Sequence, residues 1–411
     1  MKILIISNMF PPYIMGGAEM AAHSLALWLA GEGHTVHVLT SAHRRELVGT
    51  KTMAENLTVE RYYFASPYQI YQAQPQQAVM KAAWHAHDHF HFTSEGIAAE
   101  VIERFQPDII NTHSLQGIGY NLLRAVARSG VPCVQTLHDF GFLCINVNRF
   151  KDGQECDRHH LPCQFSTRIK RSYLSEIPRL AFWSPSQALL EAFGPHLPPS
   201  AQAVAIPLPL TFEQPSLEPC MSDRPIRLLY VGQVTPWKGV AFLLEVVMRL
   251  TGERPFQLHV IGDGSDLSML REKYPGSSGI VFHGKLPPEE VGGHMAKADL
   301  LLTPSLWFEN APLVISQAIR MGLPVFASRI GGLPELVDDL VSGRLLAAGD
   351  AAAWSAALKE VLDQPQLLAK WRAGAAELQP RFSVDALGTR VLDLFHQTLS
   401  PTRSSASLAE C

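Results

Sequence analysis

The stretch DLLLTPSLWFENAPLVISQAIRMGLPVFAS, residues 299–328, contains a complete strand–loop–helix–strand unit. DLLLTPS is an apolar run of strand length, LWFENA leaves it as a loop, and PVFAS is a second short apolar run. Between them, Pro312 suits the first position of a helix, Gly322 suits the position just past its end, and Pro324 prevents its continuation. Two buried strands joined by a helix predict a parallel sheet with helices packed on it.

The same alternation of strand-like runs and helical segments extends on both sides of this unit. Before residue 207 the strand-like runs are KILIIS, HTVHVLT, PDIINTHS, VPCVQTLHD, RLAFWSP and AQAVAIP, and after residue 225 they include IRLLYVGQ, FQLHVIGDG and GIVFHGK. The segment 207–225 separates the two sets with five prolines and no periodicity, which is typical of a linker.

We therefore predict an α/β protein with two Rossmann-like, doubly wound domains that face each other across a cleft. The predicted first domain is 1–206 and the predicted second domain is 226–380. We expect residues 381–398 to form a helix that packs back on the first domain and 399–411 to be a flexible, polar tail.

Composition limits the class of protein. The 411 residues are 47% hydrophobic and 18% charged, which is typical of a globular chain and excludes a largely disordered one. The formal net charge is −4 and neither half has a strong basic excess, so nucleic acid is not an expected partner. Two basic clusters, 43–45 and 168–172, are either solvated surface or a contact for phosphate head groups or an anionic acceptor.

The sequence also limits the expected location. No apolar run has the length of a membrane span, and the N-terminal run is too short for a signal peptide. A cytoplasmic location is predicted, with peripheral contact at the cytoplasmic face of a membrane at most. Six cysteines in such a chain do not predict a disulfide framework.

Candidate ligand-binding residues of the first domain lie where ligands of doubly wound sheets bind, beyond the carboxyl ends of the strands. Gly16 and Gly17 open the first helix, where missing side chains and helix amides let an anion approach. His113 ends the strand PDIINTHS, and His138 and Asp139 end VPCVQTLHD. A purely structural histidine is the competing interpretation at each position.

The loop after the first strand of the second domain holds Gly232, Gln233 and Lys238. A lysine in this place can meet a phosphate as a point charge, although an ordinary surface lysine is the alternative. Gly262 ends another strand and permits the close approach of a nucleotide base or ribose.

In the opening stretch, Glu309 precedes a helix whose first free amides, at Leu313 and Val314, are available to a diphosphate. A carboxylate does not favour phosphate, so we expect Glu309 to accept hydrogen bonds from sugar hydroxyls. Gln317 lies about one turn into the helix, where its amide could bond a ribose.

These segments carry a resemblance to a known family. PSLWFENAPLVISQAIRMGLPVFASRIGGLPELV, residues 304–337, resembles the element of Glu, seven residues and Glu, followed by Gly-Gly-x-Pro-Glu, in the family-four group of retaining, nucleotide-sugar-dependent glycosyltransferases with the GT-B fold. PPYIMGGAE, LHDFGFLC and GQVTPWKG resemble the same family in order and spacing. The resemblance covers residues 1 to about 395, and its motifs are specific in combination.

The resemblance implies transfer of a hexose from a nucleotide-diphosphate sugar to a glycan or lipid-linked acceptor, with retained anomeric configuration, in polysaccharide or cell-envelope biosynthesis. It implies no catalytic metal and no other required cofactor. The leaving diphosphate is expected to be stabilised by Lys238 and helix-end amides and to help deprotonate the acceptor. The resemblance also implies that Gly16 and Gly17 line the donor phosphate and the acceptor side, and that His113 contacts the transferred sugar. Glu309 is expected to hold the sugar hydroxyls, and Gln317 to stand at the ribose position. Gly331 and Gly332 belong to the loop that follows.

Two positions depart from the family pattern. The family has Gly-Arg where this chain has Gly232 and Gln233, and its second glutamate is Gln317 here. The chain therefore lacks one cation for the diphosphate and one charged acceptor for the ribose. An alternative is a weakened GT-B protein that binds nucleotide sugar or a partner without turnover. A GT-B epimerase would need other acid and base groups in the cleft, and the sequence presents no clear set.

Two cysteine- or histidine-rich segments are candidate metal sites. Cys144, Cys156 and Cys163, with His159 or His160, could hold a structural zinc ion, although their spacing matches no common finger and free thiols are the alternative. The segment WHAHDHFHF, residues 84–92, has four alternating histidines. For it we predict an exposed or acceptor-facing helix rather than a metal site.

Overall fold

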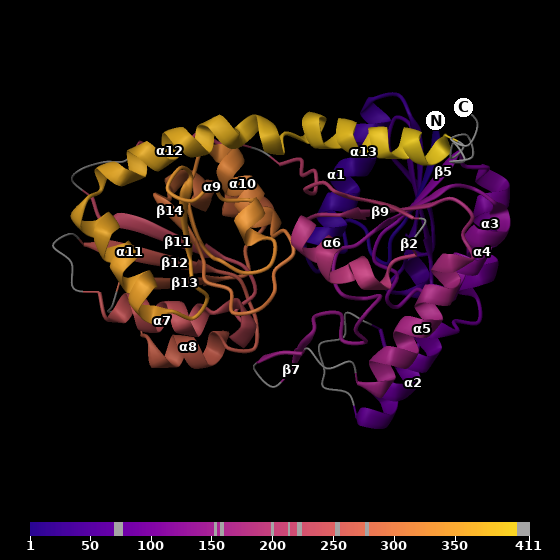
Figure 1. Cartoon of the computed structure of the whole chain (residues 1–411), viewed down its shortest axis with the longest axis horizontal. Coiled ribbons are helices and arrows are strands. Elements are labelled where there is room, and N and C mark those ends of the chain that lie inside the picture. The colour runs from indigo at the N-terminus through magenta and orange to yellow at the C-terminus, as the bar shows by residue number, and fades with distance from the viewer. Residues whose placement is uncertain are drawn as a thin grey trace, which may run out of the picture.

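The computed structural model describes residues 1–69, 77–151, 154–156, 160–198, 201–212, 214–219, 224–250, 255–275 and 279–400. Two α/β domains lie side by side, each with a mainly parallel sheet between layers of helices (Figure 1). The predicted fold class is confirmed by this arrangement.

The sheet of the first domain has the order β10-β9-β6-β5-β1-β2-β4-β3. All its pairings are parallel except that of β3 with β4. Its strands are β1 Lys2–Ile6, β2 Thr35–Ser41, β3 Gly49–Ala54, β4 Leu57–Tyr62, β5 Ile109–Thr112, β6 Cys133–Thr136, β9 Leu180–Ser184 and β10 Gln202–Ala205. A separate small hairpin is formed by β7 Phe150–Lys151 and β8 Gln154–Glu155.

Helices cover both faces of the first sheet because alternate residues of its central strand are apolar on both sides. Ile3 and Ile5 of β1 pack in one core with α1, and Leu4 and Ile6 pack in the other with α3, α4 and α6. The helices of this domain are α1 Gly17–Gly31, α2 Ala78–His89, α3 Ser94–Phe105, α4 Leu123–Ser129, α5 Leu161–Ser175 and α6 Gln187–Phe193.

The sheet of the second domain is entirely parallel in the order β13-β12-β11-β14-β15-β16. Its strands are β11 Ile226–Val231, β12 Phe256–Ile261, β13 Ile280–Gly284, β14 Leu300–Thr303, β15 Val325–Ser328 and β16 Gly343–Leu346. Its helices are α7 Val240–Met248, α8 Leu267–Lys273, α9 Pro288–Lys297, α10 Leu313–Met321, α11 Ala351–Asp363 and α12 Gln366–Leu378. One face packs on α7, α8 and α11, and the other on α9 and α10.

The opening stretch of the sequence forms β14, α10 and β15, as its pattern predicts. Pro312 precedes the helix, and Gly322 ends it with φ +78°, a left-handed conformation that glycine adopts without a Cβ penalty. The helix buries Ile315, Ala318 and Ile319 against the sheet. Its N-terminus therefore lies at the carboxyl end of β14, where the loop with Glu309 begins.

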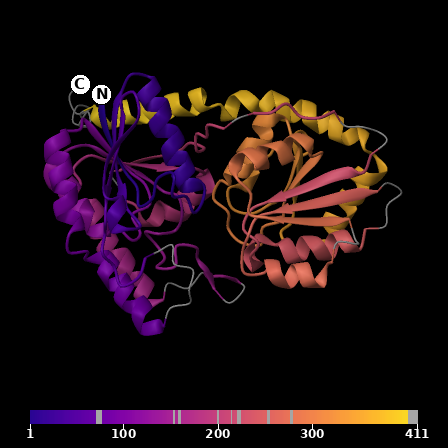
Figure 2. The same cartoon turned by 180° about the vertical axis from the view of Figure 1, so that it is seen from behind.

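The end of the chain returns to the first domain. Helix α13, Val384–Leu399, follows α12, and the two run along one side of both domains (Figures 1 and 2). Leu387, Val391, Leu394 and Phe395 of α13 are buried in the same core as α1. Trp28 Nε1 also donates to Asp385 Oδ1 at 2.9 Å. Residues 401–411 of the predicted tail lie outside the described residues.

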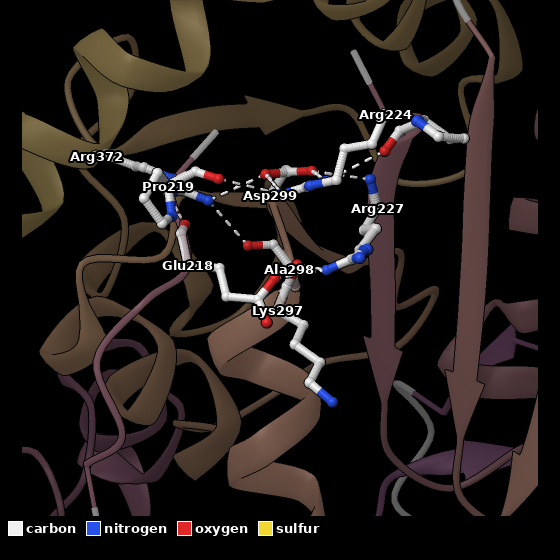
Figure 3. A network of polar contacts seen from close by, with 9 residues as sticks. Glu218, Pro219, Arg224, Arg227, Lys297, Ala298, Asp299 and Arg372 are labelled. Carbon is white, nitrogen blue, oxygen red and sulfur yellow. Dashed lines mark hydrogen bonds and ion pairs between the residues drawn. The ribbon is translucent and has the colours of Figure 1, made fainter. Parts of the chain in front are cut away.

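A charged network holds the linker against the second domain (Figure 3). Asp299, which is 2% exposed, accepts from Arg224 at 2.5 and 2.9 Å and from Arg372 of α12 at 3.1 Å. Arg227, at the start of β11, donates its backbone amide to Asp299 and its guanidinium to Glu218 of the linker, at 2.9 and 2.8 Å. The several donors make burial of this carboxylate tolerable.

Two local features were not predicted from the sequence. Helix α4 begins only at Leu123, because Gly117 and Gly119 ahead of it adopt φ of +89° and +94°, outside the helical range. The antiparallel edge formed by β3 and β4 has no counterpart among the predicted strands, and its outer strand is largely exposed.

Candidate active site

Lys238 and Glu309 form an ion pair between the loops that follow β11 and β14. Lys238 Nζ donates to Glu309 Oε1 at 2.6 Å, and Ser305 Oγ and Trp307 Nε1 donate to the same oxygen at 2.6 and 3.0 Å. Glu309 is only 5% exposed, and these donors satisfy its charge. Because β11 and β14 are neighbours in the sheet, two residues 71 positions apart meet beyond the carboxyl ends of these strands.

The loop 307–310 contacts both domains in alternation. Glu309 faces its own domain, whereas Phe308 packs against Phe140 of the first domain with ring centroids 5.1 Å apart. Asn310 Nδ2 donates to the carbonyl of His138 at 3.0 Å. The loop that holds the predicted sugar-binding carboxylate therefore also joins the two domains.

Gly331 and Gly332 lie against the back of this loop. Gly331 has φ +56°, and a Cβ there would lie 2.1 Å from the carbonyl oxygen of Glu309. The amide of Gly332 donates to the same carbonyl at 2.8 Å, and a Cβ on Gly332 would lie 2.0 Å from the carbonyl oxygen of Asn310. Only glycines allow this approach, and they hold Glu309 in place.

A second contact between the domains involves Glu335. Its two carboxylate oxygens accept from the backbone amides of Gln187 and Ala188, both at 2.7 Å. These amides belong to the first turn of α6, where helix donors lack partners within the helix. Near them, Ser186 Oγ donates to Asn310 Oδ1 at 2.6 Å. The segment 309–335 thus supplies residues both to the ion pair and to the domain interface.

His113, which was predicted to contact the transferred sugar, is almost completely enclosed by other residues in the structure. His113 is 1% exposed, and its Nδ1 and Nε2 are engaged by His138 Nε2 at 2.7 Å and Asn111 Oδ1 at 2.8 Å. His138 is partly exposed and lies in front of it. Burial lowers the pKa of His138 to about 4 and the pKa of His113 well below its usual value, so both rings are neutral near pH 7.

The first glycine pair lies at the domain boundary. A Cβ on Gly17 would lie 3.1 Å from Leu313 Cδ1, so the N-termini of α1 and α10 approach each other across the two domains. The amide of Gly16 donates to the buried Glu19 carboxylate at 2.8 Å. Two helix N-termini in one place make a region of positive potential that suits a phosphate.

Gly232 and Gly262 also meet. A Cβ on Gly262, whose φ is +141°, would lie 1.7 Å from the carbonyl oxygen of Gly232, so the loops after β11 and β12 touch backbone to backbone. Tyr230 Oη donates to the carbonyl of Gln233 at 2.6 Å, and the Gln233 side chain is exposed. The glycines therefore shape this edge of the sheet, while Gln233 is directed to solvent.

Leu313, Val314 and Gln317 lie on one partly exposed face of α10. The opposite face holds the buried side chains that pack on the sheet. Gln317 is one turn beyond Leu313, close to the helix N-terminus rather than in the core. Its side chain is partly exposed.

A zinc site at the predicted cysteines has no support. Cys144 and Cys163 are free and buried, and across the described residues they belong to no group of His, Cys, Asp or Glu close enough to share a metal ion. His159 lies outside the described residues, and His160 is exposed. In the other histidine-rich segment, His89 and His91 are 6% and 2% exposed, so the expected exposed helix is wrong for that part.

One buried polar cluster beside the site was not predicted. Lys170 is 3% exposed, its Nζ donates to the carbonyl of Gly141 at 2.6 Å, and it lies 3.9 Å from the centroid of the Tyr120 ring. Burial lowers its pKa to about 8 and raises the pKa of the nearby Asp88 to about 7. Lys170 belongs to the basic cluster 168–172, yet it supports the loop after His138 instead of facing solvent.

Two family models match this chain. Residues 15–179 match the family model described as Glycosyltransferase Family 4, and residues 221–378 match the one described as Glycosyl transferases group 1. The two matches cover the two domains in the expected order. The chain belongs to these glycosyltransferases.

Curated relatives of this glycosyltransferase are similar over most of their length. It is 25% identical to a glycogen synthase of Mycobacterium tuberculosis, over 92% of this chain and 89% of the relative. It is also 25% identical to a D-inositol 3-phosphate glycosyltransferase of Acidothermus cellulolyticus, over 95% of this chain and 88% of that protein.

Solved structures share the fold. The sucrose-phosphate synthase of Thermosynechococcus elongatus superposes with a TM-score of 0.74 at 19% identity, covering 96% of this chain and 98% of that one. The Anabaena protein HepE, in complex with UDP and glucose, superposes with a TM-score of 0.69 at 19% identity, covering 97% and 100%. Across the residues that the structure describes, no helix is long and apolar enough to pass through a lipid bilayer.

Proposed function

We propose that this glycosyltransferase moves a hexose from a nucleotide-diphosphate sugar to a glycan or lipid-linked sugar, with retention of anomeric configuration. The observation that carries the proposal is the Lys238–Glu309 pair, which places a cation and a carboxylate together beside the N-terminus of α10. A diphosphate needs the cation and the helix amides, and a sugar needs the carboxylate. Few other substrates need both within one loop pair.

In this proposal the donor lies between α10 and the loops after β11 and β12. Lys238 turns from Glu309 toward the diphosphate and, with the amides of Leu313 and Val314, stabilises the charge that develops on it. Glu309 then accepts hydrogen bonds from the sugar hydroxyls, while Gln317 bonds the ribose. Gly232 and Gly262 let the nucleotide approach the backbone.

We further propose that His138, rather than His113, contacts the transferred sugar. His138 is partly exposed and neutral. Because His113 Nε2 donates to Asn111 Oδ1, His113 Nδ1 accepts from His138 Nε2, and His138 Nδ1 is left to accept a hydrogen bond from a sugar hydroxyl. His113 thereby fixes the orientation of the His138 ring. We assign no protein side chain as the base. The departing diphosphate is the group that takes the acceptor proton in this scheme.

The finer biological role is part of the same proposal. The acceptor belongs to polysaccharide or cell-envelope biosynthesis, and the enzyme acts in the cytoplasm, in contact with a membrane surface. Helix α5 supports this contact, because Leu161 and Phe165 are 79% and 66% exposed and Arg168 and Arg171 are exposed beside them. Apolar and basic side chains on one helix suit a surface of anionic lipid.

The test is release of nucleoside diphosphate from a panel that includes UDP-glucose, UDP-galactose, ADP-glucose and GDP-mannose, with and without acceptors. We expect turnover of at least one donor, with a loss of about 100-fold or more in Lys238→Ala. Lys51→Ala, an exposed lysine of β3, is the matched control and keeps wild-type turnover. Equal turnover in Lys238→Ala would refute the assigned site.

The alternative, a protein that binds without turnover, has one observation in its favour. Gln233 and Gln317 stand where the resembled family has charged residues, so the donor loses two charged contacts. A donor that raises the melting temperature but is neither hydrolysed nor transferred would select this alternative. Absence of any thermal shift across the panel would exclude both.

A further inference from the structure

Three histidines meet at the outer edge of the second sheet. His259 lies on β12, His283 on β13, and His294 in the last turn of α9. β13 is the terminal strand of the sheet, and β12 and β11 separate it from β14, which leads to the ion pair described above (Figure 1). The cluster shares no residue with the proposed donor site.

The geometry of the cluster is close to that of a metal site. One nitrogen from each ring lies within 4.8 Å of a nitrogen from each of the others, and among the described residues this is the only such group of three or more His, Cys, Asp or Glu. His259 Nδ1 and His283 Nε2 are 2.9 Å apart, and the His283 and His294 ring centroids are 4.4 Å apart. Zinc–nitrogen bonds of about 2.0–2.1 Å place two tetrahedral ligands about 3.3 Å apart. Small side-chain rotations suffice for the three rings to share one ion.

A purely structural role does not account for His259. His259 pairs in register with Leu229 of β11 and points to the same face as Ile261, and both neighbours belong to an apolar core. An aliphatic residue would fit that face. His259 Nε2 is buried and has no hydrogen-bond partner among the described residues. The fold therefore leaves one of the two ring nitrogens of His259 without a hydrogen bond.

The charges around the cluster leave its rings neutral. Burial lowers the pKa of His259 to about 4. Burial and the His294 ring lower the pKa of His283, and burial and Lys297 lower the pKa of His294. The charged groups that act on the rings are Arg227, Lys297 and Glu290. Arg227 is already paired with Glu218 at 2.8 Å (Figure 3). Neutral imidazole is the form that binds a metal.

We propose that His259, His283 and His294 bind one divalent transition-metal ion of the zinc class, with water or Glu290 as the fourth ligand. Imidazole nitrogens select Zn²⁺, Co²⁺, Ni²⁺ and Cu²⁺ over Mg²⁺ and Ca²⁺, which prefer oxygen. Glu290 precedes His294 by one helical turn and lies on the same face of α9. All three rings are partly exposed, so the ion has access from solvent.

Besides these small rotations, binding needs a change of tautomer. The hydrogen bond between His259 Nδ1 and His283 Nε2 requires a proton on one of the two nitrogens. When the ion arrives, that proton moves to the other nitrogen of the same ring, and both imidazoles remain neutral. The ion then links β12, β13 and α9. It also lies near the proposed donor site, because Gly284, the residue after His283, accepts at its carbonyl from the amide of Gly262 at 2.8 Å.

The test is titration of the full, untagged and metal-stripped chain with Co²⁺ and with Zn²⁺. We expect one ion per chain, a visible Co²⁺ absorption typical of tetrahedral nitrogen ligation, and a higher melting temperature with Zn²⁺. His294→Ala and His283→Asn should each lose about 100-fold or more in affinity, since even changes in outer-shell partners cost 10–100-fold. Their metal-free melting temperatures should remain close to that of the wild type, which separates lost ligation from lost folding.

Two controls address the other candidate metal sites. His87→Ala, in the histidine-rich helix, and His160→Ala, beside the cysteines, should bind Co²⁺ as the wild type does. Binding that persists unchanged in both His294→Ala and His283→Asn would overturn the proposal, as would a sulfur-to-cobalt charge-transfer band, which assigns the ion to the cysteines. Absence of one-to-one binding would also overturn it. Neither readout depends on glycosyl transfer.

Discussion

Replacement of Glu309 by glutamine should separate folding from activity. The substitution keeps the shape and leaves one amide oxygen able to accept from Lys238, Ser305 and Trp307, the donors that now end on Oε1. Hydrogen bonds to a charged group contribute about 1.5–3 kcal/mol, against about 0.5–1.5 kcal/mol for neutral ones. Three weakened bonds therefore cost about 3 kcal/mol in the free energy of unfolding.

A second term opposes this cost. Glu309 is 5% exposed, and burying a carboxylate carries a desolvation penalty of several kcal/mol that a neutral amide largely avoids. Lys238 keeps partial exposure, so its unpaired charge remains hydrated. We expect a net change within about 2 kcal/mol, or a shift of the melting temperature within about 8 °C.

The effect on transfer should be much larger. Loss of one preorganised electrostatic partner of the reacting groups costs roughly 2.7–4 kcal/mol, which is a fall in turnover of about 10²–10³. The assay is release of nucleoside diphosphate from the donor that the wild type uses, beside a thermal melt of each variant. Glu377→Gln, an exposed glutamate on α12, is the control. Turnover of Glu309→Gln within about tenfold of the wild type would refute the proposed role.

Two further perturbations test the loop and the histidine pair. Gly331→Ala places a Cβ 2.1 Å from the Glu309 carbonyl oxygen, so we expect transfer to be lost. The control is Gly349→Ala, at a similar φ of +73° but with its nearest contact at 3.7 Å, which should cost only about 1–2 kcal/mol of stability and keep turnover. Equal turnover in both variants would contradict the role of Gly331. His138 has its pKa lowered by burial to about 4, so unfolding takes up a proton and stability falls as pH decreases from about 6.5 to 4. Melts across that range should show a slope smaller by up to about 1.4 kcal/mol per pH unit in His138→Gln, and an unchanged slope would argue against the assigned ionisation.

The sequence alone was sufficient to predict the helices and strands where the local pattern agrees with the tertiary structure. The unit 299–328 has strand-length runs, a proline before its helix and a glycine after it, and the structure forms β14, α10 and β15 from it. Lys238 and Glu309 were each located from the strand that precedes them. Their direct bond was not predicted, because it depends on β11 and β14 being neighbours in the sheet.

Sequence reasoning was weaker for side chains whose surroundings depend on how the chain packs. His113 and His138 end neighbouring strands with the same pattern, and only the packed structure shows that one covers the other. Lys170 was read with the basic residues around it, but its position on α5 turns it inward. His259, His283 and His294 are spread over three elements and present no motif, whereas the conspicuous run of histidines at 84–92 forms no metal group among the described residues.

The return of α13 to the first domain has a consequence for how the protein is made. The second domain completes its core at Phe382, while the first domain still lacks Leu387, Val391 and Phe395. Domains usually fold in the order in which the ribosome releases them. Here the part synthesised first becomes complete last, so we expect nascent chains arrested before residue 384 to leave the first domain sensitive to protease after the second has become resistant. The last helix therefore delays completion of the first domain's core until the second domain has been synthesised.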